Sequence, residues 1–183
     1  MKIVDMKSLS ETQVIQAAQM LADEIPGDWE DWSEVVNTDE VLEDEDTFFK
    51  GFAAVEDGDI IGWVGVDPGD SDYVYELFPL VVRRDMRGKG IGKMLLAVAE
   101  AHVRENGGLT AITYIDIRED KSFNESFLAS VDLYDNLPKH IINFSPAEHT
   151  LSHFLLKNGY KAAGVIPDSG GHGKPDIILA KHI

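Results

Sequence analysis

The stretch Arg87-Gly88-Lys89-Gly90-Ile91-Gly92-Lys93 is the part of the sequence whose residue types and spacing most clearly indicate chemistry. Glycines let the backbone approach a ligand closely, and the N–H groups and dipole at a helix start favour an anion. The stretch therefore predicts a phosphate-binding loop. It lacks the Gly-x-Gly-x-x-Gly of dinucleotide-binding folds and the Gly-Lys-Ser/Thr of P-loops, which argues against NAD and ATP. The alternative is a glycine-rich connector with surface lysines.

The segments on either side of this loop are predicted to be the strand and the helix that position it. Residues 73–82 form the longest strand candidate and contain Pro79, which lacks a donor for the strand ladder. A bulge or a splayed strand end is therefore expected there. Apolar residues at helical spacing predict a helix over 91–105, ended by Asn106-Gly107-Gly108.

The remaining elements are predicted from periodicity, capping signals and turn residues. In chain order they are a helix over 11–24, a helix over 33–45, strands over 48–56 and 60–66 joined by a tight turn at 57–59, a strand over 109–116, a long excursion over 117–144 with partial helix at 125–137, a helix from Ser145 to Asn158-Gly159, and strands over 160–166 and 176–183. Pro138 is interpreted as a helix breaker, and Pro146 as the first residue of the last helix.

This order of elements predicts one domain spanning residues 1–183. Its fold class is α/β or α+β, with a mixed sheet that carries helices on both faces.

Charge is unevenly distributed along the chain. The sequence has 33 acidic and 16 basic residues, a net charge of -17, which makes nucleic acid an unfavourable partner. Residues 8–82 contain 20 acidic residues and one base, Lys50, whereas residues 83–93 contain five bases and one acid. An anionic region and a cationic loop could thus bind different ligands, although solubility alone is the other interpretation.

Cysteine and long apolar segments are both missing from the sequence. With no cysteine, disulfides, thiolate metal sites and cysteine nucleophiles are excluded. No stretch approaches the roughly 18 apolar residues of a membrane span, so no membrane partner and a cytoplasmic location are expected.

Several motifs together resemble a known enzyme superfamily. Leu80-Val81-Val82, followed by Arg87-x-x-Gly90-x-Gly92 and an amphipathic helix, resembles the acetyl-CoA-binding core of the GNAT N-acetyltransferases. Three further stretches resemble one group of aminoglycoside 6'-N-acetyltransferases of Gram-positive bacteria: Tyr75-Glu76-Leu77-Phe78-Pro79-Leu80-Val81-Val82, Asp132-Leu133-Tyr134 and Gly173-Lys174-Pro175-Asp176-Ile177. This second resemblance covers residues 73–183 well and the N-terminal third loosely.

The resemblance implies a fold and a cofactor site. The fold would be a mixed, mostly antiparallel central sheet with a splayed central strand, and acetyl-CoA would be the co-substrate, with no metal. The backbone of Leu80, Val81 and Val82 would bind the pantetheine arm. The phosphates would be bound by Arg87, Gly88, Lys89, Gly90, Ile91, Gly92 and Lys93. Asn143 would also contact the cofactor, and a homodimer is implied.

Glu76 is the expected catalytic base. An amine with a solution pKa of about 8–10 is mostly protonated at neutral pH, so a carboxylate must accept its proton. Glu76 lies in the apolar strand that would hold the cofactor, and its match in the resembling enzymes is the proposed base. The alternative is a glutamate on the solvent face of a strand. The backbone N–H of Leu80 is expected to stabilise the oxyanion.

The sequence departs from the family at the residue that protonates the leaving thiolate. The family motif Phe-Tyr-x-x-x-Gly reads Phe154-Leu155-Leu156-Lys157-Asn158-Gly159 here, so the usual tyrosine is missing. Without such an acid, CoA leaves as an unprotonated thiolate, which costs roughly 2 kcal/mol at neutral pH. Tyr134, His149 and His153 are possible substitutes. His149 and His153 would also share one helix face at i,i+4 spacing, without a third metal ligand.

The function implied is acetyl transfer to a small polycationic amine, with an aminoglycoside as the model acceptor. Acidic segments 23–46 and 67–76 would attract the cation, and the acceptor pocket would include Trp29, Trp32, Tyr73, Glu76 and Phe78. Two alternatives stay open. The acceptor could be a polyamine or a protein amine, or the chain could be a CoA-binding module with little catalysis, as Leu155 suggests.

Overall fold

The computed structural model describes residues 1–24, 50–69, 71–116, 134–142, 144–146, 148–172 and 175–183. These residues cluster in two compact units, Met1–Ala111 with Ile183, and Ile112–His182. The predicted helix over 33–45 lies outside the described residues. A single functional domain over 1–183 stays a prediction.

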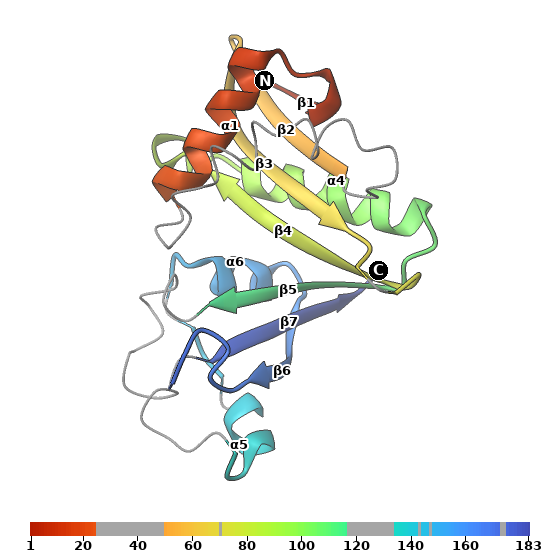
Figure 1. Cartoon of the computed structure of the whole chain (residues 1–183), viewed down its shortest axis with the longest axis vertical. Helices are drawn as coiled ribbons and strands as arrows, with labels where there is room; N and C mark the ends of the chain where they lie inside the picture. The colour runs from red at the N-terminus through yellow and green to blue at the C-terminus, as the bar shows by residue number, and fades with distance from the viewer. Residues whose placement is uncertain (25–49, 70, 117–133, 143, 147, 173–174) are drawn as a thin grey trace. The chain divides into compact units, whose positions relative to one another are not determined.

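The first unit contains an antiparallel sheet in the order β1-β2-β3-β4 (Figure 1). The strands are β1 (Lys2–Asp5), β2 (Lys50–Glu56), β3 (Asp59–Asp67) and β4 (Val74–Val82). The strands predicted over 48–56, 60–66 and 73–82 are thereby confirmed, with a tight turn between the first two. β1 was not predicted, because four residues at a sheet edge carry little local signal and depend on pairing with β2.

Two helices cover opposite faces of this sheet, as predicted. They are α1 (Glu11–Glu24) and α4 (Ile91–Glu105). Trp63 of β3 packs in one core with Ala17 and Leu21 of α1, and its Nε1 donates to the Ala17 carbonyl at 3.1 Å. A Cβ on the neighbouring Gly62 would lie 3.2 Å from Leu95 of α4. Since adjacent strand residues point to opposite faces, α1 and α4 lie on different sides.

A bulge interrupts the pairing of β3 with β4. Leu80 pairs with Val64 and Leu77 pairs with Val66, so Phe78 and Pro79 together face the single residue Gly65. This confirms the irregularity expected from Pro79. The bulge places a break in the hydrogen-bond ladder between Glu76 and Leu80.

The second unit contains short helices and the C-terminal strands. β5 (Thr110–Asp116) runs from the first unit into it, and α5 (Leu137–Ile142), α6 (Leu151–Lys157), β6 (Lys161–Ile166) and β7 (Asp176–His182) follow. The strands have the order β5-β7-β6, with β6 and β7 antiparallel. The strands predicted over 109–116, 160–166 and 176–183 are confirmed.

The start of α6 differs from the prediction of a helix beginning at Ser145. The helix begins at Leu151, where the Thr150 hydroxyl caps it by accepting from the His153 N–H at 3.1 Å. His149 has a φ of 70°, which a right-handed helix excludes. His149 and His153 therefore do not share a helix face.

Pro138 does not break a helix as predicted. It is the second residue of α5, in the first turn, where a missing N–H leaves no hydrogen bond unmade. The partial helix expected over 125–137 lies largely outside the described residues.

Among the helices that the structure describes, none is long and apolar enough to span a membrane.

Candidate active site

The glycine-rich loop joins the end of β4 to the start of α4, as predicted. A single turn of 3-10 helix, η2 (Arg84–Met86), precedes Arg87, and Gly88 and Gly90 then adopt φ values of 77° and 85°. Side-chain-bearing residues rarely adopt this conformation, which explains the two glycines. A Cβ on either one would meet no atom within 4 Å. The backbone therefore borders open space at both positions.

The N-terminus of α4 completes an anion-binding arrangement. Gly90 is the N-cap and has no side chain to satisfy the first N–H groups of the helix. The 15-residue helix directs the positive end of its dipole to the same place. Ile91 anchors this turn because its side chain is buried. Backbone, glycines and dipole together suit a phosphate group.

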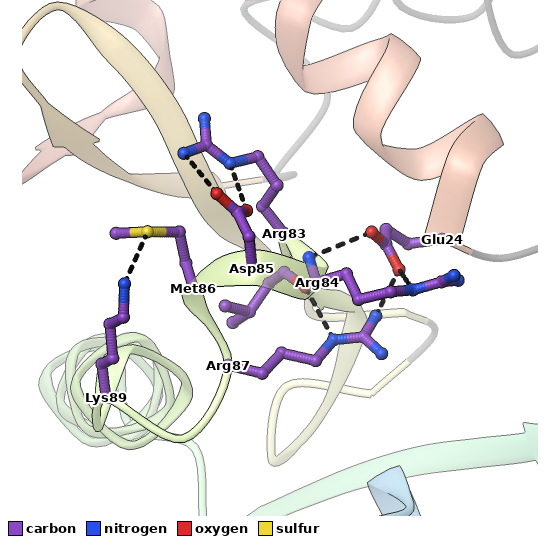
Figure 2. A network of polar contacts seen from close by, with 8 residues as sticks. Glu24, Arg83, Arg84, Asp85, Met86, Arg87 and Lys89 are labelled. Carbon is purple, nitrogen blue, oxygen red and sulfur yellow. Dashed lines mark hydrogen bonds and ion pairs between the residues drawn. The ribbon is translucent and has the colours of Figure 1, made fainter.

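Several cationic side chains of residues 83–93 already have partners in the structure (Figure 2). Arg83 makes a two-contact ion pair with Asp85, at 2.7 and 3.2 Å, and this hydrogen bond lowers the pKa of Asp85. The Lys89 Nζ lies 3.2 Å from the Met86 sulfur. Lys93 is exposed on the first turn of α4. The loop thus presents less free positive charge than its composition implies.

Glu24, the last residue of α1, contacts the loop, whereas the sequence predicted it to belong to the anionic region that attracts the acceptor. Its carboxylate accepts from the Arg84 N–H at 3.0 Å and from the Arg87 guanidinium at 2.6 Å. The contact joins residues about 60 positions apart, so only the fold reveals it. A possible signal was the acid at a predicted helix C-terminus, where the helix dipole disfavours negative charge.

Glu76 lies half-buried on β4, directly across from Asp67 of β3. Burial raises the pKa of Glu76, and the negative charge of Asp67 raises it further. The adjacent Tyr75 donates from its hydroxyl to the carbonyl of Asn106, the C-cap of α4, at 3.4 Å. Glu76 therefore points to the opposite face, on which α1 packs. A carboxylate with a raised pKa is suited to accept a proton near neutral pH.

The other predicted residues of β4 surround the bulge. Glu76, Phe78, Leu80 and Val82 are partly exposed, whereas Val81 is buried. Tyr73 precedes the strand and is 60% exposed, and its carbonyl accepts from the N–H groups of Leu109 and Thr110 at 2.8 and 3.0 Å. Trp29, Trp32 and Asn143 lie outside the described residues, so their predicted roles are not placed.

The residues considered as replacements for the missing tyrosine lie in the second unit. Leu155 is 2% exposed and belongs to the interior of this unit, whereas Tyr134 is 75% exposed. His149 occupies the turn before α6, and His153 lines an open hollow of ≈ 480 Å³. In the part of the chain that the structure describes, no group of three or more His, Asp and Glu could hold a metal ion.

Comparison with known proteins identifies a family and several similar structures. Residues 14–130 match the model of the acetyltransferase (GNAT) family. An aminoglycoside 6'-N-acetyltransferase complexed with coenzyme A is 29% identical, with a TM-score of 0.84 over all of this chain and 97% of that one. The aminoglycoside 6'-N-acetyltransferase from Enterococcus faecium is 28% identical over the same shares, with a TM-score of 0.83. No curated protein matches the chain by sequence.

Proposed function

Because the chain belongs to the GNAT family of acetyltransferases, we propose that it transfers the acetyl group of acetyl-CoA to a primary amine of a small polycationic acceptor. An aminoglycoside-like compound is the acceptor that we favour. The observation that carries this proposal is the full-length similarity to two aminoglycoside 6'-N-acetyltransferases. The half-buried Glu76 on β4 supports it independently.

Acetyl-CoA supplies an activated thioester, and the first unit offers groups that fit it. The positive-φ glycines Gly88 and Gly90 border open space next to the start of α4, as a pyrophosphate requires. The backbone of Leu80, Val81 and Val82 would bind the pantetheine arm beside the bulge. Residues from Arg87 to Lys93 would bind the phosphates, and Asn143 would add a contact.

Glu76 would accept a proton from the acceptor ammonium, so that the neutral nitrogen attacks the thioester carbonyl. A C–N bond forms and the C–S bond breaks. The nitrogen loses a second proton as the amide forms, the departing thiolate takes up one proton, and Glu76 returns its proton to solvent. The products are an N-acetyl amide, the thiol form of CoA and one released proton. The Leu80 N–H, next to the interrupted ladder, would stabilise the developing oxyanion. With Leu155 in place of tyrosine, the thiolate would take its proton from solvent, at a cost of roughly 2 kcal/mol at neutral pH.

Charge and similarity both favour a polycationic acceptor. A polycation would be attracted by the 20 acidic residues within positions 8–82. Trp29, Trp32, Tyr73 and Phe78 would supply aromatic and apolar contact surface. We further expect a homodimer located in the cytoplasm, which sedimentation and cell fractionation would test.

The test is release of thiol from acetyl-CoA in the presence of aminoglycosides, polyamines and N-terminal peptides, with mass spectrometry of the products. Acetylation of an aminoglycoside at one amine, faster than of a polyamine or peptide, is the expected result. Preferred acetylation of a polyamine or peptide would correct the acceptor class. Tight CoA binding without transfer to any amine would favour the CoA-binding module, which the buried Leu155 suggests.

A further inference from the structure

The carboxylate of Glu24 occupies an unusual place for a charged group. Glu24 is the last residue of α1, and its side chain is only 9% exposed. Negative charge at a helix C-terminus is unfavourable because the helix dipole has its negative end there. A carboxylate that is largely shielded from water also requires partners that replace its lost hydration. Glu24 must therefore be stabilised by groups outside its own helix.

Among the residues that the structure describes, those partners belong to the turn that follows β4 (Figure 2). One carboxylate oxygen accepts from the Arg84 N–H at 3.0 Å. The other accepts from the Arg87 Nη2 at 2.6 Å and lies 3.6 Å from the Arg84 Nε. Arg87 in turn donates from its Nε to the Val82 carbonyl at 3.0 Å. The Glu24 carboxylate thus binds Arg84, the first residue of η2, and Arg87, the residue directly after η2.

We propose that Glu24 is a positioning residue for the cofactor loop, resting on the proposed function for the identity of the cofactor. By binding Arg84 and Arg87 together, it sets where the chain enters Gly88 and Gly90, and hence where the first N–H groups of α4 lie. Arg87 remains 51% exposed. Its guanidinium can donate its other N–H groups to an anion while Glu24 and Val82 fix its orientation. The ligand class is the pyrophosphate of a CoA thioester.

Two effects of Glu24 on such a ligand oppose each other. Its negative charge repels a pyrophosphate, but two arginines partly neutralise the carboxylate and salt screens the remainder. Its contacts keep the loop ordered, which spares the ligand the entropy of ordering several residues. The entropy of ordering concerns several loop residues, whereas the repulsion comes from a single screened charge. We therefore expect the effect of loop ordering to exceed the repulsion. Removing Glu24 should therefore weaken cofactor binding.

The matched control is Asp23, one residue earlier at the same helix end. Asp23 is exposed, and its carboxylate accepts from Gln19 of the same helix at 2.8 Å. D23A therefore removes an equal charge from nearly the same place without removing a contact to the loop. E24Q removes the charge of Glu24 but keeps an oxygen that can accept from the Arg84 N–H.

The first measurement is CoA affinity by calorimetry, together with KM and kcat for acetyl-CoA. We expect E24A to raise Kd and KM about tenfold while kcat at saturation stays within about twofold. E24Q should fall between E24A and the unmodified chain, and D23A should leave CoA affinity within about twofold. S-acetylpantetheine, which lacks the pyrophosphate, should show the same KM with E24A as with the unmodified chain. Equal loss of both acyl donors would overturn the proposal.

The second measurement is amide hydrogen exchange over residues 84–90 without cofactor, which reports loop order directly. We expect faster exchange in E24A than in the unmodified chain, and no change in D23A. Unchanged exchange in a folded E24A variant would overturn the proposal. If the unmodified chain bound no CoA, the proposed function would fail, and exchange would still decide whether Glu24 orders the loop.

Discussion

At the level of single residues, the proposed chemistry depends on the carboxylate of Glu76. E76Q keeps the shape of the side chain but cannot accept a proton, so we expect kcat to fall about 10²- to 10⁴-fold. CoA affinity should stay within about twofold, because Glu76 is not assigned to cofactor binding. Steady-state kinetics and calorimetry provide these values.

The control for this prediction is Glu56, a glutamate at the end of another strand of the same sheet. Glu56 belongs to β2 and lies 3.8 Å from the N-terminal ammonium. E56Q should leave kcat unchanged. A rate in E76Q equal to that in E56Q would remove Glu76 from the mechanism.

The position of Asp67 in the sheet affects the pKa of Glu76. The two carboxylates are cross-strand partners, and the negative charge of Asp67, after burial, raises the pKa of Glu76. A base with a raised pKa loses activity as pH falls through that pKa. D67N removes the repulsion and lowers the pKa of Glu76, so the acidic limb of kcat/KM should move to lower pH. A limb that stays in place, or moves to higher pH, would contradict this coupling.

At the level of elements, local signals in the sequence predict those whose boundaries depend on nearby residues. A capping signal and apolar spacing predict α1, and in the structure the Gln13 amide oxygen accepts from the Ser10 N–H at 3.1 Å. The Asp57-Gly58 turn similarly predicts β2 and β3, and Pro79 predicts the bulge.

Elements that depend on distant partners could not be predicted. β1 pairs with β2 across about 50 residues, and Glu24 binds a turn that follows β2, β3 and β4 in the chain. Ser145-Pro146 has the residue types of a helix start, but the positive φ of His149 moves that start to Leu151. For the site, the loop could be predicted from glycine spacing, whereas the ion pairs of its arginines with Glu24 and Asp85 required the fold.

The turn conformation of Gly90 gives a prediction for the loop as an element. Alanine in a left-handed conformation costs about 1–2 kcal/mol, so G90A should lower the free energy of unfolding by that amount. G90A should also raise Kd for CoA about tenfold or more, because the N-cap of α4 shifts. G90E, which adds a negative charge beside the pyrophosphate, should abolish measurable binding.

Gly58 is the matched control for Gly90. It has a φ of 96° in the β2–β3 turn and, like Gly90, would place a Cβ in open space. G58A should therefore cost a similar free energy of unfolding in urea denaturation while leaving CoA affinity unchanged. Equal effects of G58A and G90A on CoA affinity would mean that the cofactor binds elsewhere.

At the level of the whole molecule, the structure shows how some charges of the anionic region and the cationic loop are paired. The loop over 83–93 has five bases and one acid, yet Arg83 pairs with Asp85, and Arg84 and Arg87 with Glu24. We therefore expect cofactor binding to depend more on backbone N–H groups and loop geometry than on free positive charge. The remaining acids within positions 8–82 have few bases near them in sequence, which favours long-range attraction of a cation over local pairing.

This attraction predicts that salt lowers kcat/KM, and that the decrease is larger for an acceptor with more positive charge. The Debye length shrinks from about 10 Å at 0.1 M to about 3 Å at 1 M, so kcat/KM for a tetracationic aminoglycoside should fall about tenfold between roughly 50 and 500 mM chloride. For a monocationic amine such as ethanolamine, the fall should stay within about twofold. Kinetics at saturating acetyl-CoA separate the effect of salt on the acceptor from its effect on cofactor binding. Equal slopes for both amines would mean that the net charge of -17 serves solubility and not acceptor recruitment.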